Sequence, residues 1–308
     1  MQLLRDLTRL PDELRCGAVS IGNFDGVHRG HARIIERLVE KARRVGGPAV
    51  VFTFDPHPVR LLRPKECPPP LTWTDRKAEL LAELGADAMI VYPTDEALLR
   101  LSAEDFFTRI VRDRLAARAM IEGSNFNFGR GRAGTIDLLR ALTAAAGIEL
   151  EVVEPMEIGG GLVSSSRVRR LIAAGDVDAA GTLLTWPYRV RGMVTHGAGR
   201  GGRIGFPTAN VDAVDTLLPG EGVYAGRAVA ASGNWPAAIN VGPNPTFGEH
   251  ALKVEAHLIG FAGVLYGQPL ELDFLARLRD IQTFASPEEL KNQLARDVSR
   301  ARDVAGRG

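Results

Sequence analysis

Short apolar runs alternate with amphipathic stretches through the first half of the chain. Runs rich in β-branched and aromatic residues predict strands at 18–21, 49–54, 88–92, 119–122 and 149–153. Apolar residues at helical spacing predict the intervening helices, the first through Ile34, Ile35, Leu38, Val39 and Ala42 and the others near 75–84, 103–115 and 136–146. This alternation is typical of an α/β fold with a parallel sheet covered on both faces. Because such sheets bind ligands where their strands end, we expect the chemistry directly after the strands.

The second half has a different pattern, in which strand-like runs follow one another without helices. A helical stretch over 173–184 ends at Trp186-Pro187, so we place domains at 1–184 and 185–308. Further strands are predicted at 188–195, 223–230, 235–241, 252–259 and 270–275. Short strands joined by Gly/Pro turns predict a closed antiparallel β-barrel. A C-terminal helix follows, because Ser286-Pro287-Glu288-Glu289 supplies an N-cap, a proline at the first helical position and a capping-box glutamate.

The turn after the first strand combines glycines with two histidines. Gly22, Gly26 and Gly30 surround His28 and His31, which lie three residues apart at the start of the first long helix. A strand, a glycine turn and a helix start direct backbone N–H groups at one spot, which suits a phosphate. Two imidazoles there could stabilise charge on a reacting phosphoryl group. The other interpretation is a pair of solvated histidines on an ordinary helix cap.

Three later strand exits also carry unusual residues. Prolines bracket His57, the connection 122–132 mixes glycines, amides, arginines and phenylalanines, and 163–169 brings serines and an arginine to a helix start. Hydroxyl and guanidinium groups at a helix start can bind an anion. The side chains of interest are His57, Asn125, Phe126, Phe128, Ser164, Ser165, Ser166 and Arg169. A rigid turn, a solvated loop and a simple N-cap are the respective alternatives.

A second glycine-rich segment, 197–202, fits the pattern G-x-G-x-x-G. Pro207 ends any helix that could follow, so we reject a dinucleotide-binding fingerprint, while a flexible loop over phosphates stays open. Thr208 and Asn210 lie two apart on an extended segment and therefore face the same side. Their oxygens suit Mg²⁺ that carries ATP phosphates, although a turn Thr and Asn that bond the backbone is the usual reading. Glu255 lies on the polar face of a predicted strand, as a surface carboxylate or as a general base.

The composition, net charge and cysteine content limit the kinds of protein to which the chain can belong. The chain has 308 residues, 45% hydrophobic and 24% charged, with a net charge of +1. This charge predicts no strong attraction to nucleic acid or to an anionic membrane, and no apolar run is long enough for a membrane span. Cys16 and Cys67 are the two cysteines, so we expect a reducing, cytoplasmic setting and no zinc site.

The first-half motifs together resemble the FAD synthetase branch of the nucleotidyltransferase superfamily. The string from Gly22 to His31 resembles its H-x-G-H signature, Thr-Phe-x-Pro-His-Pro its second motif, Gly-x-Asn-Phe-x-Phe-Gly its flavin- and nucleotide-facing loop, and Ser-Ser-Ser-x-Val-Arg its Ser-Ser-Thr-x-Ile-Arg motif. The resemblance implies a Rossmann-like nucleotidyltransferase domain in which His28 and His31 contact ATP phosphates during adenylyl transfer, assisted by Ser165, Ser166 and Arg169. It implies ATP-binding residues at Gly22, Asn23, Phe24, Asp25, Gly26, His28, His31, Ser164, Ser165, Ser166 and Arg169.

The second half is similar to riboflavin kinases. The signature is carried by His196-Gly-Ala-Gly-Arg-Gly, Gly205-Phe-Pro-Thr-Ala-Asn, Asn240-Val-Gly-Pro-Asn-Pro-Thr-Phe-Gly and Val254-Glu255 in family order. The resemblance implies Mg²⁺-ATP binding by Thr208 and Asn210 and a proposed base, Glu255, toward the ribityl 5′-hydroxyl. It implies phosphate-binding residues Gly199, Gly205, Pro207, Thr208 and Asn210 and the flavin-binding residue Arg279. The FAD synthetase resemblance implies flavin-binding residues Asn125, Phe126, Phe128 and His57. The chain departs from many members at Gly202, where they carry a second basic residue, and in the short connection 248–254.

The resemblance implies a bifunctional riboflavin kinase/FMN adenylyltransferase that makes FMN and then FAD with ATP and Mg²⁺. Its partners would be small molecules, with neither nucleic acid nor membrane, and the chain would be a monomer or a weak homo-oligomer. Two alternatives stay open at this point. One is an adenylyltransferase for another phosphate acceptor, and the other is a flavin-binding protein without catalytic activity.

Overall fold

The chain folds into two compact units. The computed structural model describes residues 1–8, 10–197, 200–244 and 249–306. The first unit consists of Met1–Pro68 and Thr74–Ser164, and the second of Pro69–Trp73 and the chain from Ser165 onward. The compact units therefore divide at 164/165, whereas the predicted functional boundary at 184/185 stays a prediction.

The first unit is built on a parallel sheet, as the sequence predicts. Its six strands lie in the order β1-β4-β3-β2-β5-β6, and every neighbouring pair is parallel. The strands are β1 (Gln2–Leu4), β2 (Ala18–Ile21), β3 (Ala49–Asp55), β4 (Ala88–Pro93), β5 (Ala119–Gly123) and β6 (Glu149–Val153). The edge strand β1 was not predicted, because its three residues are too few to show a period.

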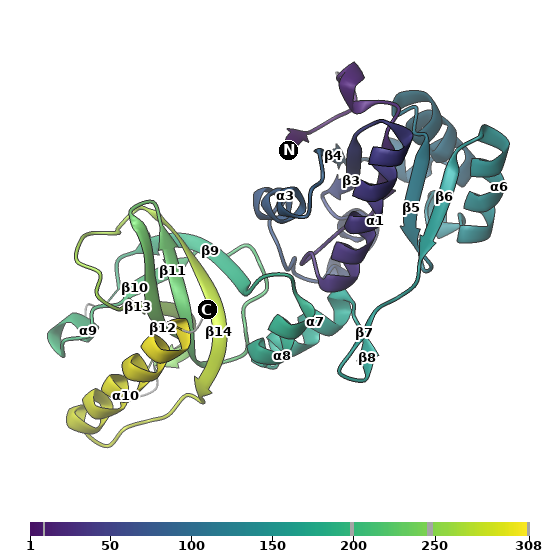
Figure 1. Ribbon diagram of the computed structural model, residues 1–308. Coiled ribbons are helices and arrows are strands. Elements are labelled where there is room, and N and C mark those ends of the chain that lie inside the picture. The colour runs from purple at the N-terminus through teal and green to yellow at the C-terminus, as the bar shows by residue number, and fades with distance from the viewer. Residues whose placement is uncertain (9, 198–199, 245–248, 307–308) are drawn as a thin grey trace. The chain divides into compact units, whose positions relative to one another are not determined.

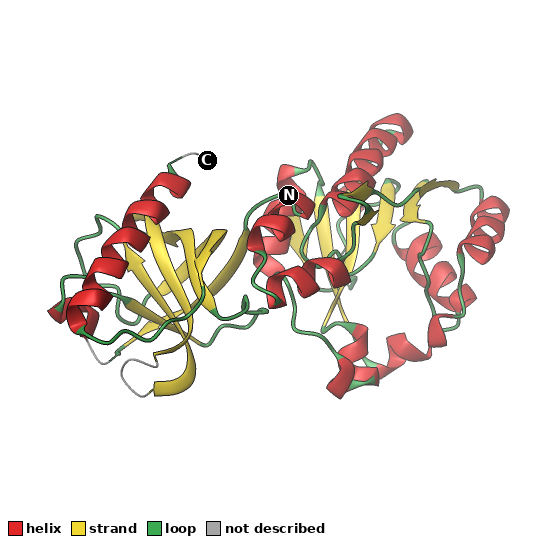
Figure 2. Ribbon diagram, turned by 90° about the horizontal axis from the view of Figure 1, so that it is seen from below, coloured by secondary structure: helices red, strands yellow, loops and turns green. Residues whose placement is uncertain are grey.

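Helices cover both faces of this sheet, as Figures 1 and 2 show. The helices and short turns are η1 (Asp12–Leu14), α1 (Arg29–Val45), α2 (Pro58–Leu62), η2 (Pro64–Glu66), α3 (Thr74–Glu83), α4 (Glu96–Arg100), α5 (Ala103–Phe106), the π-helix η3 (Phe107–Arg114), η4 (Arg130–Arg132) and α6 (Ile136–Ala146), with a small hairpin of β7 (Glu157–Ile158) and β8 (Gly161–Leu162). The predicted helix 103–115 is thus a short α-helix that continues as a π-helix.

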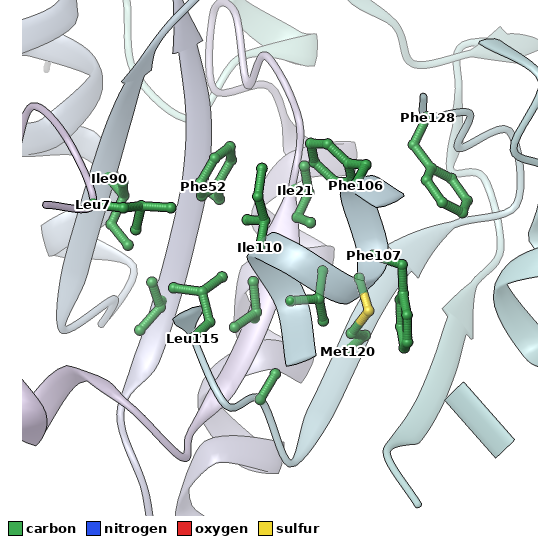
Figure 3. Close-up of a cluster of buried hydrophobic side chains, with 14 of the residues drawn as sticks. Leu7, Ile21, Phe52, Ile90, Phe106, Phe107, Ile110, Leu115, Met120 and Phe128 are labelled. Carbon is green, nitrogen blue, oxygen red and sulfur yellow. The ribbon is translucent and has the colours of Figure 1, made fainter. Parts of the chain in front are cut away.

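Alternate residues of the central strands enter two separate cores. On β3, Val50 and Phe52 pack with residues of α5, η3 and α6, whereas Ala49 and Val51 pack with α1 and α3. Figure 3 shows the first core, in which Phe106 and Ile110 lie beside Phe52 and Ile21. A strand buried on both faces explains why these runs are continuously apolar in the sequence.

The second unit is a closed antiparallel barrel, which confirms the predicted fold class. Its strands lie in the order β10-β13-β12-β11-β14-β9, and β9 also pairs with β10. They are β9 (Tyr188–Thr195), β10 (Ala209–Asp212), β11 (Gly222–Ala230), β12 (Gly233–Asn244), β13 (Glu249–Leu258) and β14 (Pro269–Arg279). The unit also holds α7 (Ser165–Ala173), α8 (Val177–Leu183), α9 (Arg200–Arg203) and α10 (Pro287–Ala305). The C-terminal helix α10 begins at its predicted Ser286 cap and lies along the barrel (Figure 2), where Ala301 packs with Val223, Ala225 and Leu278.

A short stretch of the first half of the sequence, Pro69–Trp73, is part of the second unit. The carbonyl of Pro70 accepts the backbone N–H of Leu217 at 2.9 Å, and the Arg191 guanidinium lies 4.8 Å from the ring centre of Trp73. Leu71 and Trp73 are 2% and 7% exposed, respectively. Leu71, Thr72 and Trp73 of this stretch are therefore buried, whereas Pro69 and Pro70 are exposed.

Candidate active sites

The first candidate site is the turn that connects β2 to α1, the long helix in front of the sheet in Figure 1. β2 is buried throughout, and the chain then reverses through three residues with positive φ: Phe24 (45°), Gly26 (83°) and Val27 (36°). A positive φ at a β-branched residue is a strained conformation that functional turns often retain. His28 follows as the N-cap of α1, where its Nδ1 accepts the backbone N–H of His31 at 3.2 Å.

The two predicted histidines lie against each other. Their ring centres are 3.6 Å apart with the planes 15° from parallel, and the Phe24 ring meets His31 edge-on at 5.2 Å. Burial lowers the pKa of His28 to about 4. Burial also lowers the pKa of His31 well below 6.5, helped by the charges of His28 and Lys77. Both rings are therefore neutral at pH 7.

Neutral rings make these histidines hydrogen-bond donors of fixed direction. Because Nδ1 of His28 accepts a hydrogen bond, its proton lies on Nε2, which is free to donate to a ligand. Nδ1 of His31 and Oδ1 of Asn23 are buried without a hydrogen-bond partner among the described residues. Buried polar atoms normally form hydrogen bonds. Buried atoms without a partner in a turn of this kind are therefore expected where a substrate binds.

The turn lies at the switch point of the sheet, where the order of the strands reverses. β2 lies between β3 and β5, and chain segments leave it toward both edges, which is where open α/β sheets bind ligands. A Cβ at Gly123, at the end of β5, would lie 3.2 Å from Oδ1 of Asn125 and 3.7 Å from Ile34 of α1. The predicted Asn125 loop therefore passes beside the helix that carries His31.

The serine motif begins near the same helix start. A Cβ at Gly30 would lie 3.7 Å from the carbonyl oxygen of Val163, the residue before Ser164. Ser164 is the last residue of the first unit, whereas Ser165, Ser166 and Arg169 belong to α7 of the second. Nε of Arg169 donates to the carbonyl of Pro69 at 3.0 Å. That these three residues act with the histidines stays a prediction.

The predicted flavin-binding residues have different local roles. Phe128 is 6% exposed and belongs to the hydrophobic core, while the half-buried Phe126 stacks on it with ring centres 5.4 Å apart. Asn125 is exposed. His57 caps α2, with Nδ1 accepting the backbone N–H of Val59 at 3.1 Å. Phe128 thus anchors the loop in the hydrophobic core, whereas Asn125 and Phe126 remain accessible to a ligand.

Two ionisable groups beside this turn, the half-buried Lys77 and the buried Glu122, were not predicted from the sequence as site residues. Nζ of Lys77 donates to the carbonyl of Asn23 at 2.7 Å, and burial lowers its pKa against the opposing effect of Asp25 and Asp55. Oε1 of Glu122 accepts the backbone N–H of Ile21 at 2.8 Å, and burial raises the pKa of this carboxyl well above its usual range. Lys77 belongs to no local motif, and Glu122 begins the connection 122–132, but nothing in the sequence indicates that its carboxyl is buried.

The second candidate site is a row of polar residues across the barrel. Asn210 of β10 pairs directly with Glu255 of β13 and with Thr195 of β9, and Glu255 pairs with Asn240 of β12. Directly paired residues share a face of the sheet. The flanking residues are buried inside the barrel, and they are Val194, Ala209, Val211, Ile239, Val241, Val254 and Ala256. The polar row therefore lies on the outer face of the barrel.

The glycine-rich segment approaches this row closely. A Cβ at Gly197 would lie 2.1 Å from Nδ2 of Asn210, and a Cβ at Gly201 would lie 3.5 Å from Oγ1 of Thr208. Gly205 has a φ of 89°, which favours glycine at this turn. The carbonyl of Pro207 lies 2.8 Å from Nδ1 of His257. The predicted phosphate residue Gly199 lies outside the described residues.

Thr208 and Asn210 present a hydroxyl and an amide oxygen, both hard ligands that fit Mg²⁺ bound to phosphates. Among the described residues no group of three His, Cys, Asp or Glu side chains could hold a metal ion. Arg279, predicted to bind flavin, is paired with the buried Asp297 of α10 through Nε and one Nη, at 2.9 and 2.8 Å. It therefore fastens α10 to the barrel, and its contact with flavin stays a prediction.

Known proteins match both halves of the chain. A family model described as FAD synthetase matches residues 11–167, and one described as riboflavin kinase matches residues 184–305. A bifunctional riboflavin kinase/FMN adenylyltransferase of Pseudomonas fluorescens is 38% identical over 99% of this chain and 98% of its own length. The chain belongs to the bifunctional riboflavin kinase/FMN adenylyltransferase family. Its first half is the FAD synthetase domain and its second half the riboflavin kinase domain.

Two further proteins match the chain over nearly its whole length. The bifunctional riboflavin kinase/FMN adenylyltransferase of Escherichia coli K12 is 34% identical over 99% of this chain and 98% of its own. A solved structure from Streptococcus pneumoniae, named as a macrolide-efflux protein, is 28% identical with a TM-score of 0.87, over 97% of this chain and 98% of that one. None of the described helices has the length and apolar character that a membrane span requires. The resemblance, the fold and the two enzyme activities predicted from the sequence are thus confirmed.

Proposed function

We propose that the two candidate sites perform the two family reactions with the residues named above. The observation that carries this is the placement of Asn210 and Glu255 side by side in the kinase half and of His28 and His31 in contact in the synthetase half. Thr208, Asn210 and the ATP phosphates would hold Mg²⁺, which supplies positive charge that favours phosphoryl transfer. The oxygen donor set fits this ion.

In the kinase site, Glu255 takes the proton of the riboflavin 5′-hydroxyl. The oxygen then bonds to the γ-phosphorus of ATP, and the bond to ADP breaks. Asn210 lies directly across from Glu255, so the ATP phosphates that Asn210 would bind lie within reach of the base. Positioning and charge stabilisation are sufficient for phosphoryl transfer, and no covalent enzyme intermediate is needed.

In the synthetase site, a phosphate oxygen of FMN bonds to the α-phosphorus of ATP while the bond to pyrophosphate breaks. Nε2–H of His28 and the ring of His31 donate to the phosphate oxygens on which charge increases. Neutral donors suit this role because they need not release a proton when the product leaves. Ser165, Ser166 and Arg169 would complete this set.

We further propose a monomer or weak homo-oligomer that acts in the cytoplasm. The free thiols of Cys16 and Cys67 support a reducing setting. Functional domains at 1–184 and 185–308 are supported by the family matches that end at 167 and begin at 184.

The test is incubation of the purified protein with riboflavin, Mg²⁺ and ATP, with products separated by chromatography. FMN and FAD are expected in that order of appearance. Recovery of FMN without FAD, together with adenylylation of another phosphate acceptor, would support the first alternative. Flavin binding without ATP turnover would support a non-catalytic protein.

A further inference from the structure

On the outer face of the barrel, Asn240 lies where the polar row meets the apolar cluster that packs against α10. It pairs with Glu255 of β13 on one side and with Val223 of β11 on the other. Val223 belongs to the apolar cluster that packs against α10, whereas Glu255 belongs to the polar row. The sequence neighbours Ile239 and Val241 are completely buried inside the barrel, so the Asn240 side chain lies on the same outer face as Glu255.

The amide of Asn240 is only partly satisfied. Its Nδ2 is buried and has no hydrogen-bond partner within the described part of the chain. Burying an amide N–H without a partner is destabilising, and native proteins retain such groups for a reason. The side chain of Val223 on one neighbouring strand has no acceptor, whereas the side chain of Glu255 on the other neighbouring strand is polar.

We propose that Asn240 is a further substrate-binding residue of the kinase site, where its amide N–H donates to the hydroxyl oxygen that Glu255 deprotonates. This inference rests on the proposed role of the Glu255 site. A hydroxyl has one hydrogen to give and two lone pairs to receive, so a carboxylate and an amide N–H on neighbouring strands are complementary to it. The proton passes to Glu255, the oxygen stays bonded to Asn240, and it then attacks the γ-phosphorus as ADP leaves.

The test compares Asn240→Leu and Asn240→Ser with Asn234→Leu, a matched control at an exposed position of the same strand. Asn240→Leu is expected to lower kcat/KM for riboflavin at least about tenfold, with FMN adenylylation unchanged. Asn240→Ser retains a donor and is expected to keep more activity than the leucine variant. The control variant is expected to behave as wild type in both reactions.

Two further measurements separate substrate binding from a structural role. Asn240→Leu removes an unsatisfied buried amide, so the melting temperature of the ligand-free variant should equal or exceed that of wild type. Wild type should bind riboflavin more tightly than 5′-deoxyriboflavin, and Asn240→Leu should reduce that difference. A lower melting temperature, or an unchanged preference for riboflavin, would overturn the inference.

The design also distinguishes this inference from the proposed function. If wild type makes no FMN, the proposed function itself is wrong. If wild type makes FMN, Glu255→Gln abolishes it and Asn240→Leu stays within about twofold of wild type, only the role of Asn240 is wrong.

Discussion

Asn210 and Glu255 lie directly opposite each other on the antiparallel strands β10 and β13, although 45 positions separate them in the sequence (255 − 210). Their pairing brings the proposed amide ligand for phosphate-bound Mg²⁺ and the proposed carboxylate base to one place on the barrel. We therefore expect that a substitution in one half of the chain abolishes one activity and leaves the other intact.

Replacing Glu255 by alanine should abolish conversion of riboflavin to FMN. The base is lost, and general bases contribute roughly 10²- to 10⁴-fold to such rates. FAD formation from supplied FMN should continue at the wild-type rate, as measured by chromatography of the flavin products. Loss of both activities would contradict the assignment of Glu255 to one site.

The double variant His28→Ala, His31→Ala should have the opposite phenotype. It removes the two proposed donors to the phosphates, and removal of even one preorganised donor costs about 10²–10³ in kcat. FAD formation should fall below detection while the riboflavin kinase rate stays largely unchanged. Equal loss in both assays would contradict the model of two independent sites.

Stability should fall in mild acid because His28 resists protonation in the folded state. Its pKa is about 4 when folded and 6.5 otherwise, so between these values the unfolded chain binds more protons. Stability is therefore complete above pH 6.5 and decreases as the pH falls toward 4, by about 3 kcal/mol for this residue. Burial of His31 adds a loss of the same sign. Urea unfolding between pH 4 and 7 should show a smaller decrease for His28→Gln than for wild type, and equal slopes would refute this account.

Two glycines of one loop should respond differently to alanine. A Cβ at Gly197 would lie 2.1 Å from Nδ2 and 2.7 Å from Cγ of Asn210, so Asn210 must move. A Cβ at Gly202 meets no atom within 4 Å. Gly197→Ala should therefore lower the kinase kcat/KM for ATP about tenfold or more, because a small displacement of a positioning group is costly. Gly202→Ala should be close to wild type, and similar losses in both would argue against a role for Asn210 in ATP binding.

The sequence predicts the longer elements well, since buried strands and amphipathic helices carry their own periodicity. Strand 188–195 and helix 136–146 have the bounds that their patterns indicate. The strand β1 and the segment Pro69–Trp73 could not be predicted, because each is short and is held in place by residues distant in sequence.

The candidate sites were predictable where a motif is local and not where it depends on register. His28 is the N-cap of α1 and His31 lies three residues later in its first turn, so their contact follows from the local geometry of a helix start. The pairing of Glu255 with Asn210 and Asn240 depends on which strands become neighbours. Lys77 reaches Asn23 from another helix, and nothing near it in the sequence indicates that contact.

The placement of Pro69–Trp73 has a consequence for dividing the gene. A fragment that ends at residue 184 keeps Leu71 and Trp73 but loses Arg191 and Leu217, which contact this segment, so two core side chains become exposed to water. A fragment that begins at 185 lacks the carbonyl that accepts the N–H of Leu217 and the ring that lies beside Arg191. A synthetic peptide of residues 69–73 added to the latter, or the same residues grafted onto its N-terminus, is the natural way to restore a well-packed kinase half.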